Sequence, residues 1–279
     1  MKIGIVLLNY KNYNDTIDCI NSLINQNYYN LYICVVDNFS NNDSIKQIKK
    51  NVKENSKKVF YIENEENLGF AKGNNVGIRF LKKEKKCDYI FVLNTDTIIS
   101  DKDFFNKFID DVKKIDAKVA LINPMCYGLN NNYMYPSFKC ANSIAEFMKG
   151  MKKRYIIYFI KSLFNINRVN KRIINVDMLK ELDNYNYVIQ GCSYFLTPTF
   201  FKYYDGLFSE TFLYCEELAL AIYLSNKDLK TINFYNLTLL HKEGGSSVQN
   251  GGIIRRMKKF KQMLNSYKYV KEYYKKTNK

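Results

Sequence analysis

The sequence lacks the features that define several large protein classes. The apolar run Tyr155–Ile160 is bounded by basic residues and is too short to cross a bilayer. The run Met1–Leu8 stops at Asn9 without a small-residue cleavage pattern, so we expect no secretory signal peptide. Seven cysteines are scattered without a CxxC pair, which argues against a disulfide framework and a zinc cluster and favours a reducing compartment. We therefore expect a soluble, cytoplasmic protein.

The positive charge is confined to two segments. The formal net charge is +16, which raises the question of a nucleic-acid partner. Residues 149–172 contain eight Lys/Arg and no acid, and residues 253–279 contain ten Lys/Arg and one acid, so the rest of the chain is close to neutral. Apolar residues recur there at three- and four-residue steps, which predicts an amphipathic helix in each region. They are Ile144, Phe147, Met151, Tyr155, Phe159 and Leu163, and then Ile253, Met257, Phe260, Leu264, Tyr267, Val270 and Tyr274.

Two interpretations of these basic helices stay open. Such helices can lie in the headgroup region of an anionic membrane, which would make the protein peripheral at the inner face of the plasma membrane. Alternatively, each apolar stripe packs on the protein body and the lysines form a solvated face. No aromatic–glycine RNA-binding signature accompanies the charge, so nucleic acid is not an expected partner.

The first half of the chain alternates strand-like and helix-like segments. Strand patterns span 2–8, 31–37, 59–62, 89–93 and 119–122, and helix patterns span 15–25, 44–55, 74–83 and 103–114. The pattern blurs over 130–186 and then resumes with strands at 187–196 and 231–240 and a helix at 216–224. This alternation predicts an α/β fold with a mostly parallel central sheet and helices on both faces. We expect one domain over residues 1–250 and a basic amphipathic tail over 251–279.

Ligands of such sheets bind in the loops that follow the carboxyl ends of the strands. One of these loops is Asn94-Thr95-Asp96, where a carboxylate can hold Mg²⁺ or Mn²⁺ on a diphosphate. Another begins at Asp37, which can accept hydrogen bonds from a base or a ribose. Both acids also have ordinary structural explanations, because Asn and Asp form turns, and Ser40 or Asp43 can cap the next helix.

Three further features are candidates for chemistry. The loop Asn67–Asn75 contains two glycines that let the backbone approach a ligand, but it has neither GxGxxG nor a Walker lysine, so neither a dehydrogenase nor a P-loop enzyme is supported. Glu216 and Glu217 open a helix after an aromatic run. They can supply a general base beside a sugar hydroxyl, or they can simply be acids stabilised by the helix dipole. His241, the only histidine, ends a strand before a glycine-rich stretch, which suits a metal ligand, although lone histidines are more often structural.

Taken in order, these motifs resemble those of family 2 glycosyltransferases with the GT-A fold, of the rhamnosyltransferase-like group. The matching stretches cover roughly residues 1–247 and read VLLNYKN, VVDNFSNNDS, ENLGFAKGNNVGI, YIFVLNTDT, GCSYFLTPTFFKYYDGLFSETFLYCEELAL and LLHKEGGSS. The resemblance implies a Rossmann-like GT-A catalytic domain over 1–250. Its nucleotide-binding half would span about 1–125 and its acceptor half about 126–250.

The resemblance also implies a role for each matching residue. Asp96, in the DxD-like element, and His241 are expected to hold Mn²⁺ or Mg²⁺. Glu216 and Glu217 form the catalytic pair, with Glu217 as the base, and the residues expected on the acceptor side are Gly191 and Cys192. Contacts to the nucleotide sugar are expected from Leu8, Asn9, Tyr10, Asp37, Asn67, Gly69, Ala71, Lys72, Asn94, Thr95 and Asp96.

The implied activity is inverting transfer of a hexosyl or rhamnosyl group from a UDP- or dTDP-linked donor, ahead of a GDP-linked one. The acceptor would be a saccharide, expected to be lipid-linked, in the synthesis of bacterial capsule, O-antigen or cell-wall glycan. The chain departs from the family pattern after the acid pair. The usual Glu-Asp reads Glu216-Glu217, and a later Asp and Arg are replaced by Ala219 and Tyr223. These departures favour an alternative in which the protein binds a nucleotide sugar or glycan but is catalytically impaired.

Overall fold

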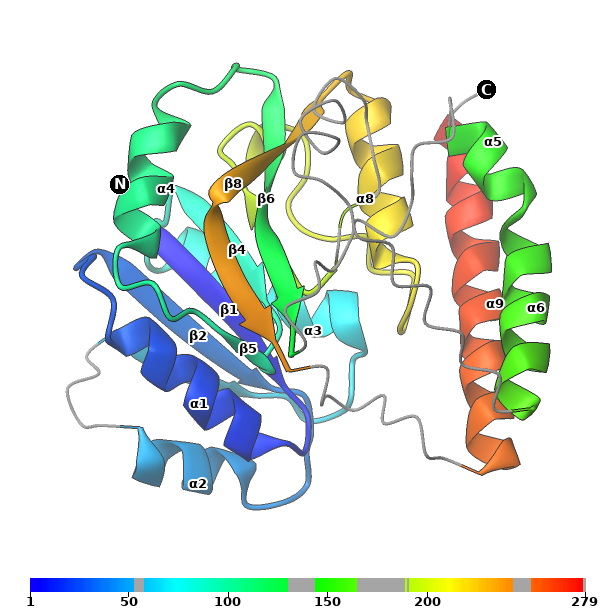
Figure 1. The fold of residues 1–279 in the computed structure, drawn as a ribbon, viewed down its shortest axis with the longest axis horizontal. Helices are drawn as coiled ribbons and strands as arrows, with labels where there is room; N and C mark the ends of the chain where they lie inside the picture. The colour runs from blue at the N-terminus through cyan, green and yellow to red at the C-terminus, as the bar shows by residue number, and fades with distance from the viewer. Residues whose placement is uncertain (53–57, 130–143, 165–188, 190, 243–251, 278–279) are drawn as a thin grey trace.

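The centre of the molecule is one mixed sheet. The computed structural model describes residues 1–52, 58–129, 144–164, 189, 191–242 and 252–277, and over them the sheet has eight strands in the order β3-β2-β1-β4-β7-β6-β8-β5 (Figure 1). The strands are β1 Ile3–Asn9, β2 Leu31–Asp37, β3 Val59–Glu63, β4 Tyr89–Leu93, β5 Thr97–Ile98, β6 Val119–Gly128, β7 Ser193–Leu196 and β8 Lys230–His241.

The sheet is parallel on one side and mixed on the other. Strands β3, β2, β1 and β4 run parallel, and so do β6 and β8. Strand β7 is antiparallel to its neighbours β4 and β6, and the short β5 is antiparallel to β8. The predicted α/β fold with a mostly parallel sheet is confirmed. The alternation of strand and helix patterns does not reveal the direction of β7, because that direction depends on long-range pairing.

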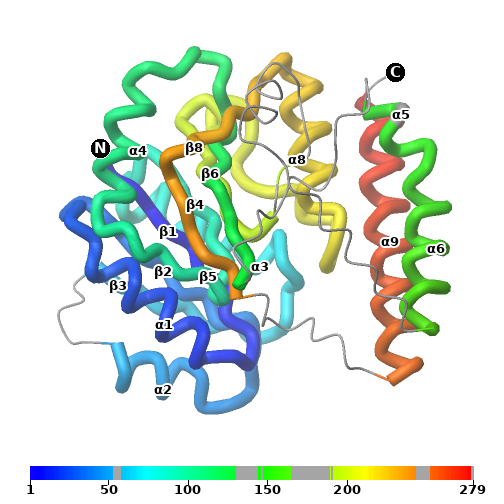
Figure 2. The backbone as a smooth tube through the Cα atoms, viewed as in Figure 1, coloured from blue at the N-terminus to red at the C-terminus, as the bar shows by residue number. Residues whose placement is uncertain are grey.

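Helices cover both faces of the sheet. Alternate strand residues point to opposite faces, so Ile5 and Leu7 pack with α1 (Tyr13–Ile24), α2 (Ser44–Asn51) and α4 (Phe104–Val112). Val6 packs on the opposite face with α3 (Phe70–Lys83) and α8 (Glu216–Ser225), beside the short 3₁₀ helix η2 (Phe200–Lys202). The chain trace shows α1 and α2 together on one side of the strands (Figure 2). Two apolar layers thus hold the strand ends that carry the candidate site residues.

A helical pair stands beside this body. Helix α5 (Ile144–Lys149) leads into α6 (Met151–Leu163), which packs against α9 (Ile253–Thr277) as the outermost layer in Figure 1. The two predicted apolar stripes face each other, since the rings of Phe159 and Phe260 stack with centroids 4.5 Å apart. Farther along α9, Val270 is fully buried against residues of α8. Both amphipathic helices are confirmed, and most of each stripe is used in packing, except Ile253 and Met257 at the start of α9, which are exposed.

No helix among the described residues combines the length and the apolar character needed to span a membrane.

Helix α3 begins at Phe70, four residues earlier than its sequence pattern predicts. Gly69 has a φ of +79°, which allows the chain to turn sharply there, and the amide of Phe70 donates to the carbonyl oxygen of Phe212 at 2.8 Å. Ala71 and Lys72 therefore belong to the first turn of a helix and not to a loop.

Candidate active site

The ends of β1 and β2 are joined by a closed set of hydrogen bonds around Asp37. Asn9 and Asp37 are partners in the parallel register, and Asn9 Nδ2 donates to Asp37 Oδ1 at 2.6 Å. Ser40 donates to the same carboxylate twice, from its backbone N–H at 2.9 Å and from its hydroxyl at 2.6 Å. Thr16 holds the other end of Asn9, because its hydroxyl donates to Asn9 Oδ1 at 2.7 Å. This part of the site is rigidly preorganised by its own side chains.

Asn38 ties the next loop to this edge. Its Nδ2 donates to Asn67 Oδ1 at 2.9 Å and to the carbonyl of Gly69 at 3.1 Å, and its Oδ1 accepts the backbone N–H of Leu68 at 3.0 Å. Sequence reasoning gave Asn38 no role, although it stands beside Asp37 in the quoted motif. Both polar atoms of the Asn38 side chain make these hydrogen bonds, so Asn38 holds the loop Asn67–Gly69 in place. This loop is called the glycine loop below.

The predicted donor-binding residues differ in exposure. Tyr10 and Lys72 are exposed and Leu8 is partly exposed, so their side chains reach the surface. Ala71 is buried in the apolar core beneath the first turn of α3. Asn94 and Thr95 are partly exposed at the end of β4, where the amide of Asn94 donates to the carbonyl of Cys192 at 2.8 Å.

Asp96 and His241 meet because β5 pairs with the end of β8. Thr97 is the register partner of His241, which places the preceding Asp96 beside the imidazole. Asp96 Oδ1 lies 3.0 Å from His241 Nε2, and the two side chains are only 10% and 12% exposed. One carboxylate oxygen and one imidazole nitrogen at this distance fit a divalent cation such as Mn²⁺. The structure thus brings together the two residues predicted to hold the metal.

The acid pair opens α8 after a strained turn. Tyr214 and Cys215 both have left-handed backbones, with φ of 75° and 69°, an arrangement that costs energy for residues other than glycine and that clusters at functional sites. Burial, together with the charge of Glu217, raises the pKa of Glu216 to about 8, and burial raises the pKa of Glu217. Among the described residues, Glu216 Oε1 has no hydrogen-bond partner. Carboxyl groups with raised pKa are suited to take up a proton.

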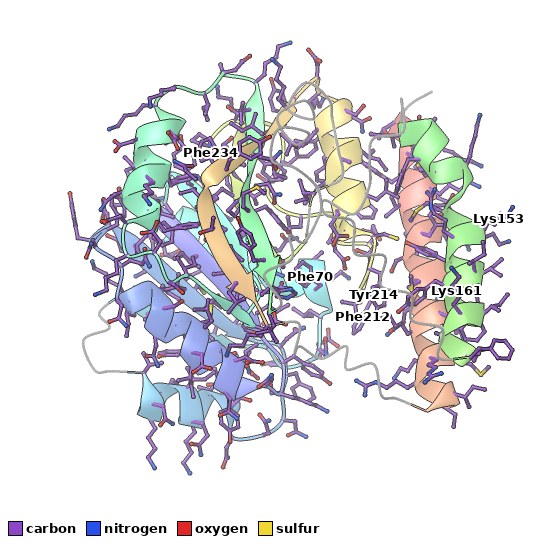
Figure 3. The ribbon with its side chains drawn as sticks, viewed as in Figure 1. Phe70, Lys153, Lys161, Phe212, Tyr214 and Phe234 are labelled. Atoms are coloured by element: carbon purple, nitrogen blue, oxygen red, sulfur yellow. The ribbon has the colours of Figure 1, made fainter. Side chains whose placement is uncertain are left out.

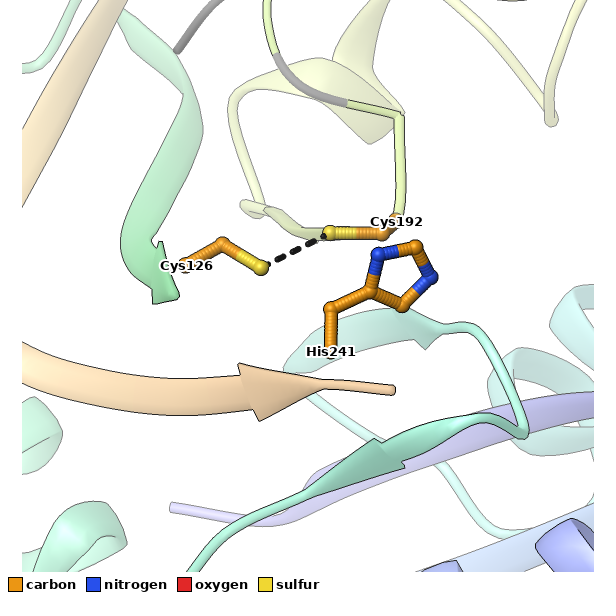
Figure 4. A group of neighbouring side chains, drawn as sticks. All are labelled: Cys126, Cys192 and His241. Carbon is orange, nitrogen blue, oxygen red and sulfur yellow. Dashed lines mark hydrogen bonds between the residues drawn. The ribbon is translucent and has the colours of Figure 1, made fainter. Parts of the chain in front are cut away.

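Gly191 and Cys192 connect the acid pair to the strand ends that carry Asp96 and His241. A Cβ atom on Gly191 would lie 2.1 Å from Glu217 Oε1, so the backbone of Gly191 packs directly on that carboxylate. The next residue, Cys192, has its Sγ 3.3 Å from Cys126 Sγ, in a group that also contains His241 (Figure 4). The hydrogen bond between Cys192 and Cys126 lowers the pKa of the Cys192 thiol. Neighbouring Cα atoms are about 3.8 Å apart, so this dipeptide places Glu217 within a short distance of the group that contains His241.

Tyr194 is a second residue that sequence reasoning did not identify. It lies on β7, is buried, and its hydroxyl has no hydrogen-bond partner among the described residues. Burial and the charges of Glu217 and Glu216 raise its pKa, so the phenol stays neutral beside the acid pair. Only the alternation along β7 could have indicated that it faces this side.

The loop before the acid pair touches the glycine loop. A Cβ atom on Gly69 would lie 2.2 Å from the carbonyl oxygen of Phe212, which also accepts the amide of Phe70. In Figure 3, Phe212 and Tyr214 are seen between Phe70 and the helical pair. The donor-side and acid-side loops are thus in direct contact.

The two departures from the family pattern are packing residues. Ala219 is fully buried against α5, α6 and α9 residues. Tyr223 stacks on Tyr204, with ring centroids 4.0 Å apart and planes 9° apart. Neither position carries charge toward the site. The glycine-rich stretch after His241, and most of the blurred segment 130–186, lie outside the described residues.

Comparisons with known proteins agree with this fold. The sequence model of glycosyl transferase family 2 matches residues 4–169, more than half of the chain. No curated protein matches the sequence. The mannosyltransferase PcManGT from Pyrobaculum calidifontis, in complex with GDP-Man and Mn²⁺, is similar with a TM-score of 0.58 and 11% identity, over 88% of this chain and 58% of that one.

Residues 1–349 of S. aureus TarS, in complex with UDP-GlcNAc, give a TM-score of 0.58 and 14% identity, over 95% of this chain and 67% of that one. The same TarS fragment in complex with UDP gives 0.56 and 13%, over 93% and 65%. The chain therefore spans about three fifths to two thirds of the length of these structures. At such low identity the likeness shows a shared GT-A fold.

Proposed function

We propose that this chain, which belongs to glycosyl transferase family 2, transfers a sugar from a nucleotide diphosphate to a saccharide acceptor with inversion at the anomeric carbon. The single observation that supports this most is the dipeptide Gly191-Cys192, which packs on Glu217 at one end and lies beside His241 at the other. A base and a cation-binding pair on either side of one short segment are what a direct displacement between acceptor and donor needs.

In this proposal Asp96 and His241 hold a divalent cation, Mn²⁺ or Mg²⁺. When bound, the cation offsets the negative charge on the leaving diphosphate. Asn9 and Asp37 position the nucleoside, and the glycine loop at Gly69 covers it. Glu217 removes the proton from an acceptor hydroxyl, which attacks the anomeric carbon from the face opposite the leaving group. One displacement inverts the configuration, so no enzyme nucleophile is required.

The donor is a UDP- or dTDP-linked sugar ahead of a GDP-linked one. TarS was solved with UDP-GlcNAc and PcManGT with GDP-Man and Mn²⁺, which supports a nucleotide-sugar partner and a divalent metal in this fold. We further propose a hexosyl or rhamnosyl group, a lipid-linked acceptor, and a place in bacterial surface polysaccharide synthesis.

The donor site can be tested by thermal stabilisation. The protein is heated with UDP-, dTDP- and GDP-sugars, each with Mn²⁺, Mg²⁺ or a chelator. We expect one nucleotide to stabilise only when metal is present, and Asp96→Ala to abolish the shift. Asp110→Ala is the matched control, because that acid forms only an exposed pair with Lys113 at 3.0 Å. Equal stabilisation of Asp96→Ala would exclude Asp96 as a metal ligand.

A second candidate is a protein that binds nucleotide sugars or glycans on this fold without turning them over. It is favoured by Ala219 and Tyr223, which replace the usual charged residues with buried packing. Donor-dependent stabilisation without release of nucleoside diphosphate, across a panel of saccharide acceptors, would support it over catalysis.

We also propose that the protein is peripheral at the inner face of the plasma membrane, through one end of the helical pair. From the middle of α6 to its end, and in the first turns of α9, seven apolar side chains are 40–81% exposed. These residues, called the hairpin end below, are Ile156, Ile157, Ile160, Phe164, Ile253, Ile254 and Met257. Lys153 extends from α6 on its outer side (Figure 3), and Lys161 is a second lysine of this helix. An exposed apolar end among lysines suits an anionic lipid surface.

Vesicle binding tests the hairpin end. Deleting α9 is a poor test, because it would also uncover residues of α8 that it buries. We expect the protein to bind anionic vesicles over neutral ones, and Phe164→Glu with Ile254→Glu to weaken that binding at least about tenfold, since each buried apolar side chain contributes about 1.5–3 kcal/mol. Tyr29→Glu is the control, because Tyr29 is equally exposed on the sheet body. Unchanged binding of the double variant would exclude this surface.

A further inference from the structure

Two thiols and the imidazole form a compact group of ligand atoms at the sheet edge. Cys126 lies near the end of β6, Cys192 just before β7, and His241 at the end of β8. Each residue offers one ligand atom such that all three lie within 4.8 Å of one another, and the two Sγ atoms are 3.3 Å apart. The spacing of the cysteines in the sequence argues against a zinc cluster. The structure brings two of them together because β6 and β8 run parallel and β7 lies antiparallel beside β6.

The two nitrogens of His241 face different partners. Nε2 lies 3.0 Å from Asp96 Oδ1, and the ring nitrogen next to Cγ, Nδ1, is turned toward Cys192 in Figure 4. When Asp96 accepts a hydrogen bond from Nε2–H, the lone pair of the neutral ring is on Nδ1, on the side of the thiols. A carboxylate that orients a histidine in this way is a common support for a metal ligand.

We propose that Cys126, Cys192 and His241 form a three-ligand site for a thiophilic divalent cation of the Zn²⁺ class. Zinc is bound at about 2.3 Å by sulfur and about 2.0 Å by nitrogen, so tetrahedral ligand atoms lie roughly 3.5–3.8 Å apart. The three atoms reach that spacing by shifts on the order of 1 Å. Each thiol that binds loses its proton to solvent, and water fills the fourth position.

The donor set selects against the hard cations. Thiolate and imidazole ligands favour zinc and cobalt, whereas Mg²⁺ and Mn²⁺ favour oxygen, and Mn²⁺ is the weakest binder of the transition series at mixed sites. Cys126 and Cys192 have no role in the proposed sugar transfer. Binding of a second kind of metal ion would give these two buried thiols a role.

The two modes share His241, which gives the soft-metal site a consequence for activity. With Mn²⁺ or Mg²⁺, both Asp96 and His241 are ligands. With Zn²⁺, His241 turns its Nδ1 to the thiols and Asp96 only orients it. The structure therefore assigns Zn²⁺ as an inhibitor that competes with the donor-site cation. This consequence rests on the proposed function, whereas the binding site does not.

Cobalt titration of the full chain tests the site without any substrate. Reduced protein is titrated with Co²⁺, whose thiolate charge-transfer absorption in the near ultraviolet reports sulfur ligands and whose intensity reports how many. We expect a band for two thiolates, saturation at one ion per chain, and displacement by Zn²⁺ but not by Mg²⁺. Absence of the band in the reduced wild-type protein overturns the proposal, including the case in which the two cysteines merely oxidise to a disulfide in air.

Serine variants assign the ligands. Cys126→Ser and Cys192→Ser should each remove about half of the band and weaken Zn²⁺ binding by at least about tenfold to a hundredfold, since even outer residues of metal sites contribute that much. Cys87→Ser is the matched control, because Cys87 is equally buried but lies at the opposite end of the strands. It precedes β4, whereas Cys192 lies beside the carboxyl end of that strand. A full band in Cys126→Ser or Cys192→Ser would overturn the assignment. If a variant fails to fold, the intensity of the band in the wild-type protein still reports the number of thiolate ligands.

Competition separates this inference from the proposed function. Zn²⁺ should suppress Mn²⁺-dependent donor stabilisation in the wild-type protein, and much less in the double variant Cys126→Ser with Cys192→Ser. If no nucleotide sugar stabilises the protein but the cobalt band is present, the proposed function fails and the metal site stands. If a nucleotide sugar stabilises the protein and Zn²⁺ suppresses this stabilisation equally in the wild type and the double variant, the thiols are not the zinc ligands.

Discussion

The carboxylates on the two sides of the candidate active site are held in opposite ways. Asp37 accepts three hydrogen bonds from Asn9 and Ser40, which fix the position of its carboxylate. Glu216 and Glu217 are mostly buried, and burial raises the pKa of both. Glu216 Oε1 has no hydrogen-bond partner among the described residues. Carboxyl groups that are removed from water take up protons more readily than exposed ones. The fold therefore separates an acid that is fixed by hydrogen bonds from acids whose raised pKa suits them to exchange a proton.

The largest effect is expected from the base. Glu217→Gln removes the proton acceptor, and general bases contribute about 10²–10⁴-fold to rate. We expect turnover to fall by that factor while donor-dependent thermal stabilisation is retained. The measurement is release of nucleoside diphosphate at saturating donor. Glu210→Gln, an exposed acid before the same helix, should behave as wild type. Transfer at the wild-type rate in Glu217→Gln would remove this residue from the base role.

Gly191→Ala tests whether the carboxylate must stay where the backbone places it. The added Cβ would meet Glu217 Oε1 at 2.1 Å, so the side chain must move. A displacement of about 1 Å can reduce rate about 10²-fold. We expect a fall in kcat with little change in donor affinity. Gly252→Ala has open space around its Cβ and serves as the control. A variant as active as wild type would show that this contact does not set the geometry of the base.

On the donor side, Asp37→Ala should act first on stability. It leaves Asn9 Nδ2 and two donors of Ser40 without their acceptor, and each buried unsatisfied group costs about 1–3 kcal/mol. Denaturant titration should show a loss in this range together with weaker donor binding. Asp43→Ala is the control, because Asp43 makes no side-chain cap bond to α2. Equal stability of the two variants would contradict the hydrogen-bonded role of Asp37.

The smallest effect concerns pH. Only the ionised base accepts a proton, so activity should rise with pH through the raised pKa range of the pair, near 8 for Glu216. Glu216→Gln removes one buried charge, and coupled acids titrate as a pair. The rise of activity with pH should therefore occur about one pH unit lower in this variant. Stability should change in the opposite sense: folding favours the protonated acids, so it falls as pH rises from about 4.5 toward 8. A rise of activity near pH 4.5 in the wild-type protein would contradict the raised pKa values.

The sequence predicted the parallel half of the sheet well, because local patterns determine it. Strands β2 and β4 begin and end at the predicted residues, and the alternation of apolar residues along β1 supplies both faces of the core. The early start of α3 was missed because it depends on the backbone of Gly69 and on a hydrogen bond to Phe212, a residue 143 positions away.

The candidate site was predicted in its members more than in its arrangement. Strand ends indicated Asp96 and His241, but their 3.0 Å approach requires the two-residue strand β5, which no periodicity can reveal. The pairing of Cys126 with Cys192 depends on long-range strand order in the same way. The apolar stripes of α6 and α9 were recognised, whereas their mutual packing could not be distinguished from membrane contact by pattern alone.

The packing of α9 also fixes when the active site can be completed. Helix α9 follows every described strand of the sheet in the chain, so it leaves the ribosome after all of them, and chains begin to fold from the amino end during synthesis. The donor loops around Asp37 are complete by then. The apolar face of α8 with Ala219 and Ile222 is covered only once Tyr267 and Val270 arrive. A nascent chain should therefore gain the ability to bind its donor before the helix that carries Glu217 is locked in place.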